Sequence, residues 1–91
     1  MVYGLLVTYM NTEPLLKQRL IPWGHIIIYD NKIVISGLIT TKTIPTRNIA
    51  NVYVNKLSQK IKIETSGGEK RDVTIAGSAE KVKEIIEKTL I

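Results

Sequence analysis

Apolar and polar residues alternate along much of the chain with the two-residue period of a β-strand. The clearest runs are residues 25–30 (HIIIYD) and 32–39 (KIVISGLI), which are rich in β-branched side chains. Asp30 and Asn31 predict a two-residue turn between the runs, because both residue types tolerate positive φ angles. The pattern therefore predicts a β-hairpin at this point of the chain.

The same period predicts four further strands, at residues 40–44, 49–54, 59–65 and 71–75. Pro45 ends the first of them, because proline cannot donate a hydrogen bond to a neighbouring strand. We expect a turn at Leu57 and Ser58, and a hairpin loop at residues 66–69, where two glycines allow left-handed angles. In residues 59–65, one face carries Lys60, Lys62 and Glu64, and the other Ile61, Ile63 and Thr65.

The period changes after residue 77. Ser78 is a good N-cap, and apolar side chains then recur at helical spacing as Val82, Ile85, Ile86 and Leu90. Residues 78–90 therefore predict one amphipathic helix whose apolar stripe covers the strands.

The first 22 residues give a weaker pattern. Residues 2–9 predict a possible strand, and Thr12 can cap a short helical turn that carries Leu15, Leu16 and Leu20 on one side. Together the elements predict a single domain over residues 1–91 of mainly β, α+β class. We expect a bent antiparallel sheet, or a partly open small barrel, capped by the C-terminal helix.

Composition narrows the class of protein. The 91 residues fit one domain, and no cysteine is present for a disulfide, a thiol nucleophile or a cysteine-type zinc site. The N-terminus lacks the basic start of a signal peptide, and every apolar run is shorter than the roughly 18 residues of a membrane helix. We expect a cytoplasmic protein with no integral membrane segment.

The net charge of +5 is concentrated in one stretch of the chain. Residues 41–62 contain Lys42, Arg47, Lys56, Lys60 and Lys62 and no acidic residue. Such a block attracts phosphate or acidic partners, although surface lysines also occupy solvated strand faces in many proteins.

Three segments together resemble the pleckstrin-homology-like domains of bacteria and archaea. They are the hairpin IIIYDNKIVIS, the segment K-x-I-P-x-x-x-I-x-x-V-x-V of residues 42–54, and the hairpin KIKIETSGGEKRDVTI before a helix. The resemblance covers residues 23–91 and implies a pleckstrin-homology-like fold. In that fold Ile44, Pro45 and Ile49 have a structural role rather than a binding role.

The resemblance also implies a non-enzymatic role. Many eukaryotic relatives bind phosphoinositides through basic residues between the first two strands, but here we expect that loop to be Asp30-Asn31, which offers no cation. Other relatives bind peptides or proteins, and prokaryotic members often form oligomers.

Catalytic and metal chemistry have few candidate groups. His25 is the single histidine and lies beside an isoleucine run, without a second histidine or a cysteine to form a metal site. Residues 66–68 are no phosphate loop, because the Gly-Lys-Ser/Thr ending is missing. We expect no enzyme activity and no cofactor.

Two binding modes stay open. Lys60 and Lys62 share a strand face to which Tyr53 can be adjacent, an arrangement that favours single-stranded nucleic acid. Alternatively, the strands around Ile27 and Val34 are apolar on both faces, so one face needs cover from the segment around Leu15, Leu16, Leu20 and Trp23 or from another subunit.

We therefore expect a non-enzymatic binding or assembly module that acts through protein–protein contacts or as a homo-oligomer. The alternatives are nucleic-acid binding and weak binding of anionic lipid, at a peripheral membrane, or of phosphate. The residues predicted to contact an anionic partner are Arg47, Lys56, Lys60, Lys62, Lys70 and Arg71.

Overall fold

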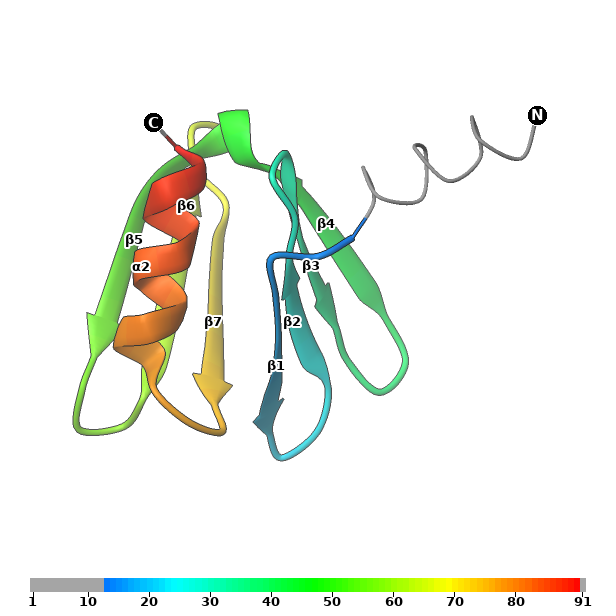
Figure 1. Cartoon of the computed structure of the whole chain (residues 1–91), viewed down its shortest axis with the longest axis vertical. Helices are drawn as coiled ribbons and strands as arrows, with labels where there is room; N and C mark the ends of the chain where they lie inside the picture. The colour runs from blue at the N-terminus through cyan, green and yellow to red at the C-terminus, as the bar shows by residue number, and fades with distance from the viewer. Residues whose placement is uncertain (1–12, 91) are drawn as a thin grey trace.

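The computed structural model describes residues 13–90 and shows a strand-rich body with one helix on it (Figure 1). Its elements are β1 (Leu16–Ile21), β2 (His25–Ile28), β3 (Lys32–Ser36), β4 (Thr41–Pro45), η1 (Thr46–Asn48), β5 (Ile49–Asn55), β6 (Lys60–Thr65), β7 (Lys70–Ile75) and α2 (Ala79–Thr89).

The strands form one antiparallel sheet in the order β4-β3-β2-β1-β7-β6-β5. In this order β4 and β5 are the two edges, so the sheet bends around the core without closing into a barrel. The fold is mainly β with a C-terminal helix packed on the sheet, as the sequence predicts. The strand order is consistent with the pleckstrin-homology-like topology that the resemblance implies.

The core lies on the inner face of the bent sheet and is built mainly of isoleucine. In β2, β3 and β4 the register places Ile26 opposite Ile35, Ile28 opposite Ile33, and Ile33 opposite Ile44. Ile61 and Ile63 of β6 complete the inner face, and both are fully buried. Each buried isoleucine contributes about 1.5–3 kcal/mol of transfer free energy, so strand alternation alone supplies most of the core.

Helix α2 begins where the sequence predicts. The Ser78 hydroxyl accepts a hydrogen bond from the Lys81 backbone N–H at 3.2 Å, which satisfies one free donor of the first turn. Val82 and Ile86 are buried, Ile85 packs against the core, and the helix contacts β5, β6 and β1. Leu90 follows the last helical residue and is 42% exposed, so the apolar stripe ends earlier than predicted.

The helical turn predicted for the N-terminal segment is wrong, because its described part is strand β1. Leu16 and Leu20 face inward at the two-residue spacing of a strand, while Lys17 and Arg19 point outward. Pairing with β2 and β7 fixes this strand. The expectations for residues 2–9 and Thr12 lie outside the described residues.

Most predicted turns are confirmed. Tyr29 donates its backbone N–H to the Lys32 carbonyl across the Asp30-Asn31 turn, and a turn covers residues 56–59. The strand predicted over residues 32–39 is shorter, because Gly37 donates its N–H to the Thr40 carbonyl at 2.8 Å and starts a loop at that point. Leu38 and Ile39 therefore belong to the β3–β4 loop.

Candidate binding groove and basic sheet face

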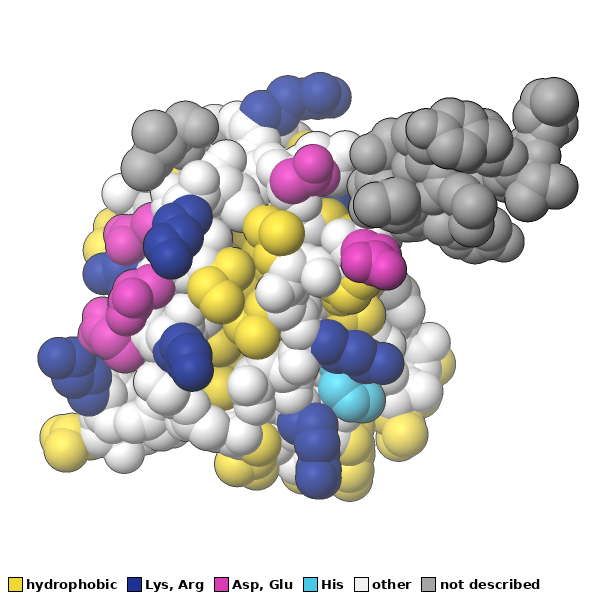
Figure 2. Space-filling model, viewed as in Figure 1, with side chains coloured by type: hydrophobic (Ala, Val, Ile, Leu, Met, Phe, Trp, Pro, Cys, Tyr) yellow, Lys and Arg dark blue, Asp and Glu magenta, His cyan; other side chains and the backbone are white. Residues whose placement is uncertain are grey.

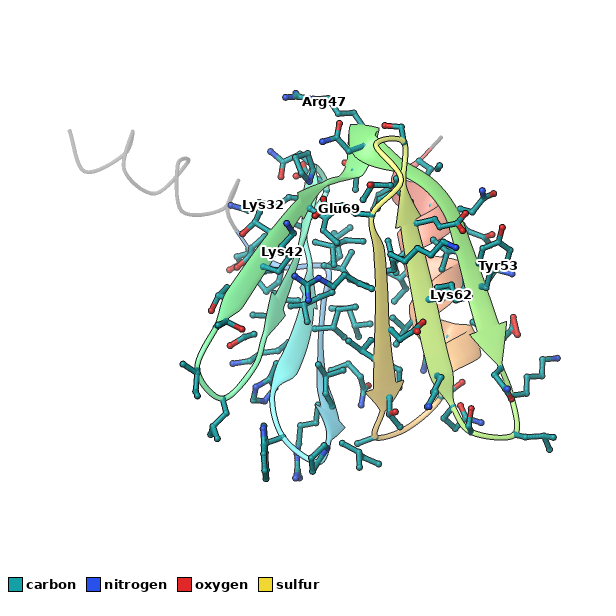
Figure 3. All side chains as sticks on the ribbon, turned by 180° about the vertical axis from the view of Figure 1, so that it is seen from behind. Lys32, Lys42, Arg47, Tyr53, Lys62 and Glu69 are labelled. Carbon is teal, nitrogen blue, oxygen red and sulfur yellow. The ribbon has the colours of Figure 1, made fainter. Side chains whose placement is uncertain are left out.

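The six predicted anion-binding residues do not form one patch. Lys60, Lys62 and Lys70 lie on the outer face of β6 and β7, whereas Arg71 is on the inner face of β7. Lys56 lies in the β5–β6 turn, where its Nζ is 3.8 Å from Glu80 Oε1. Arg47 lies on η1 at the opposite end of the molecule (Figure 3). The six predicted residues are thus spread over four places in the fold.

The outer face of β5 and β6 does bring an aromatic ring to the lysines, as the sequence predicts. Tyr53 pairs with Lys62, whose Nζ lies 6.0 Å from the ring centroid, and Tyr53 is 49% exposed. With Asn55 and Lys60, these residues border a hollow of about 290 Å³. We call Tyr53, Asn55, Lys60 and Lys62 the Tyr53 face.

Acidic groups reduce the positive charge of this face. Glu64 lies 3.7 Å from Lys70 Nζ and accepts hydrogen bonds from Asn51 and Tyr53. Asp72 borders the same hollow, directly opposite Lys62 in the register. The face therefore combines an exposed ring, two lysines and nearby carboxylates.

A second hollow opens where β4 faces β7, and residues from both faces of β7 line it. Its walls include Leu20, Trp23, Ile35, Lys42, Arg71 and Val73, around a volume of about 290 Å³. We call these six residues the β4–β7 groove. Lys42 stands two residues before the buried Ile44, and Arg71 stands two residues before Val73. Strand alternation therefore points both cations to the side of the sheet that carries the core.

The two cations of the groove differ in their partners. Lys42 Nζ lies 3.3 Å from Glu69 Oε2, and Figure 3 shows the two side chains turned toward each other. This ion pair borders a neighbouring hollow of about 420 Å³ between β4 and the β6–β7 turn. Arg71 forms no ion pair with any residue in the range 13–90. The groove thus contains one guanidinium without an anionic partner in the described part of the chain.

Large apolar side chains are exposed beside the groove. Trp23 is 58% exposed in the β1–β2 loop, and Leu38 and Ile39 are 70% and 91% exposed in the β3–β4 loop. The two loops are adjacent, since a Cβ atom on Gly24 would lie 3.4 Å from the Cα atom of Gly37. We call Trp23, Leu38 and Ile39 the apolar end.

The figures show where this end lies. The β1–β2 and β3–β4 loops are at the lower end of Figure 1, opposite the β2–β3 turn. In Figure 2, hydrophobic side chains lie at the same lower end, with basic side chains and the histidine above and between them. The apolar end is therefore bordered by positive charge.

Lys42 was predicted as part of the basic block but not as one of the six contact residues, Trp23 was predicted only as a packing residue, and Arg71 was grouped with the outer lysines. The signal for Lys42 and Arg71 was present in their two-residue spacing from Ile44 and Val73. The loop between the first two strands was also placed wrongly, because within residues 13–90 these strands are β1 and β2. That loop is residues 22–24, which contain Trp23 and no cation.

The strands expected to be apolar on both faces are only partly so. Ile27 and Val34 face each other on the outer side of β2 and β3, and both are half-buried. Leu16 and Leu20 point into the core, while Leu15 and Trp23 are exposed. These residues of the N-terminal segment therefore do not cover the outer face as a layer, because they belong to β1 and its flanks.

Within residues 13–90, no group of three or more histidine, cysteine, aspartate or glutamate side chains is arranged to hold a metal ion. No helix in the same range is long and apolar enough to cross a membrane. No protein-family model matches the chain, and no curated protein matches it.

Proposed function

We propose that this chain is a cytoplasmic, non-enzymatic binding module that docks a protein partner through the apolar end and the β4–β7 groove. The exposure of Trp23, Leu38 and Ile39 on two adjacent loops carries this proposal. Single exposed apolar residues are ordinary, but several large ones on adjacent loops are typical of interaction surfaces. Trp23 also has the size and amphipathic character of residues that dominate binding energy at interfaces.

Charge complementarity indicates the kind of partner. The chain has a net charge of +5, and the groove beside the apolar end contains Arg71, which has no ion-pair partner within residues 13–90, whereas Lys42 is paired with Glu69. Two copies meeting through this surface would bring like charges together, which opposes association. An apolar segment with acidic side chains fits the surface better than a second copy of the chain does.

A synthetic array of random twelve-residue peptides tests this role. We expect the wild-type protein to bind a subset of apolar, acidic peptides, and Trp23→Ala or the double change Leu38→Ser with Ile39→Ser to weaken binding at least about tenfold. Leu57→Ser is the matched control, because Leu57 is 99% exposed in the separate β5–β6 turn. Circular dichroism checks that each variant is folded.

Two results would contradict the proposal. One is peptide binding that is equally strong in the apolar-end variants and the Leu57→Ser control. The other is a stable homo-oligomer in light scattering that the double change at Leu38 and Ile39 converts to monomer, because the surface would then be occupied by a second copy.

The Tyr53 face supports a second candidate function, binding of single-stranded nucleic acid. An exposed ring flanked by Lys60 and Lys62 offers a stacking platform with phosphate contacts, worth about 1–3 kcal/mol for each stacked base. The test is fluorescence anisotropy with a labelled oligothymidylate at low and high salt. Changing Lys60 and Lys62 to Glu should abolish binding, whereas the same change at Lys81 and Lys88, both exposed on α2, should leave most of it.

If the two double variants lose oligothymidylate binding equally, the oligonucleotide is attracted by net charge alone. The Tyr53 face is then not a binding site. Weak binding of anionic lipid or phosphate, the remaining alternative, has no cation in residues 22–24 to support it.

A further inference from the structure

The β4–β7 groove departs from the pattern of the inner face. Elsewhere on this face the strand positions hold isoleucines such as Ile28, Ile33 and Ile63, all fully buried. Lys42 lies opposite Ile35 in the register, and Arg71 lies opposite Ile63. A cation beside apolar side chains costs free energy unless it meets water or an anion. Breaks of this kind in an otherwise consistent pattern are typical of functional sites.

The charges of the groove leave one positive group available. Lys42 is engaged by Glu69 at 3.3 Å, so the pair is neutral overall. Asp72 also borders the groove, but it alternates with Arg71 and Val73 and lies opposite Lys62 on the outer face. Arg71, without an ion-pair partner among the described residues, is left to bind an anion.

The residues that line the groove limit which chemical group can be attached to the bound anion. Leu20, Ile35 and Val73 give the groove an apolar floor, and Trp23 stands at its side. A volume of about 290 Å³ is at the lower limit of ligand pockets, so it fits one or two amino-acid side chains rather than a long ligand. Small size, an apolar floor within a mixed lining and one guanidinium favour a carboxylate next to an apolar group.

We propose that the β4–β7 groove binds an acidic side chain of the docked partner segment, together with the apolar residue beside it; this inference rests on the proposed function. The planar guanidinium of Arg71 matches a carboxylate with two parallel hydrogen bonds, a geometry that lysine does not offer. The neighbouring apolar residue packs on Leu20, Ile35 and Val73. Trp23 joins the groove to the apolar end, so one continuous segment occupies both.

The experiment starts from the peptide array described above. It uses those peptides that lack tryptophan and whose binding is weakened by Trp23→Ala. Each is resynthesised with every Asp or Glu changed singly to Asn or Gln, and with a free or an amidated C-terminus. Trp23 is the single tryptophan of the chain, so its fluorescence reports binding directly. We expect one acidic position to lose about 10- to 100-fold in affinity, as a charge-assisted hydrogen-bonded pair would.

Two variants locate the contact. In Arg71→Gln, the same acidic-to-amide change in the peptide should have almost no effect, because the partner of the carboxylate is gone. Lys70→Gln is the matched control, since Lys70 precedes Arg71, faces the other side of β7 and removes the same charge. In this control the 10- to 100-fold dependence should persist.

The outcomes separate the two proposals. If peptides bind through Trp23 but no acidic position matters, or the dependence survives in Arg71→Gln, the groove assignment is overturned and the docking function stands. Dependence on the free C-terminus alone also overturns it, because the carboxylate would not be a side chain. If no peptide binds in a Trp23-dependent way, both proposals are overturned.

Discussion

The inner face of the sheet has two parts that the same strands build differently. Where α2 lies over β5, β6 and β1, most inner positions are apolar, and Ile63 and Ile86 are fully buried. Where β4 faces β7, no helix in the described chain covers the groove, and the inner positions include Lys42 and Arg71. The boundary falls within one strand pair, because Ile63 and Arg71 are direct neighbours.

This difference shows how a packed second layer affects which residue types a strand needs at its inward positions. Alternation decides which side chains point inward, but only a packed second layer makes an apolar side chain necessary there. At the uncovered groove a cation remains hydrated, and it is available to a ligand that supplies the missing layer. We therefore interpret the groove as the place where the partner segment completes the fold.

The largest effect should come from charging the covered part. Ile86→Asp buries a carboxylate with no counter-charge at a fully buried position, and we expect more than about 4 kcal/mol of lost stability and an unfolded domain. Lys81→Asp introduces the same group at an exposed position of the first helical turn and should stay folded. Urea denaturation followed by circular dichroism measures both, and a folded Ile86→Asp protein would refute the helix-on-sheet core.

Shortening one side chain in the covered part and one in the groove should lower the free energy of unfolding by different amounts. Ile63→Ala leaves a cavity in the buried core and should cost about 2–5 kcal/mol. Val73→Ala removes two methyl groups that are already half exposed, so we expect about 1 kcal/mol. Equal free energies of unfolding for the two variants would mean that the groove is as tightly packed as the covered part.

The smallest effect concerns the ion pair at the edge of the groove. The side chains of Lys42 and Glu69 are 37% and 64% exposed, so a double-mutant cycle with alanine should give a coupling of about 0.2–1 kcal/mol that falls with added salt. A coupling well above this range, or one insensitive to salt, would show that the pair holds β4 to β7 as part of the fold.

Much of the fold was predictable because its signals are local. The Asp30-Asn31 turn, the loop at residues 66–69 and the Ser78 cap each depend on a few neighbouring residues. Strand β1 was missed because Gln18 interrupts its alternation, while Leu16 and Leu20 also fit helical spacing. The Gln18 side chain donates to the Ala76 carbonyl at 2.7 Å, a contact 58 residues away that the local sequence does not reveal.

The groove was less predictable for the same reason. Lys42 and Arg71 are 29 positions apart in the chain, and their common hollow follows from the order and bend of the strands. Alternation could have marked each of them as inward-facing, but no local pattern shows that β4 faces β7. The position of Tyr53 beside the lysines of β6 was predicted correctly, because β5 and β6 are joined by a short turn that fixes their register.

The most direct test of the central claim is the free energy of unfolding of Arg71→Leu. If Arg71 serves binding rather than folding, replacing it with an apolar residue on the inner face should leave stability unchanged or raise it by up to about 1 kcal/mol. Urea denaturation beside wild type gives the value without any knowledge of the partner. A loss of more than about 1 kcal/mol would contradict the account, because Arg71 would then be a structural residue of the sheet.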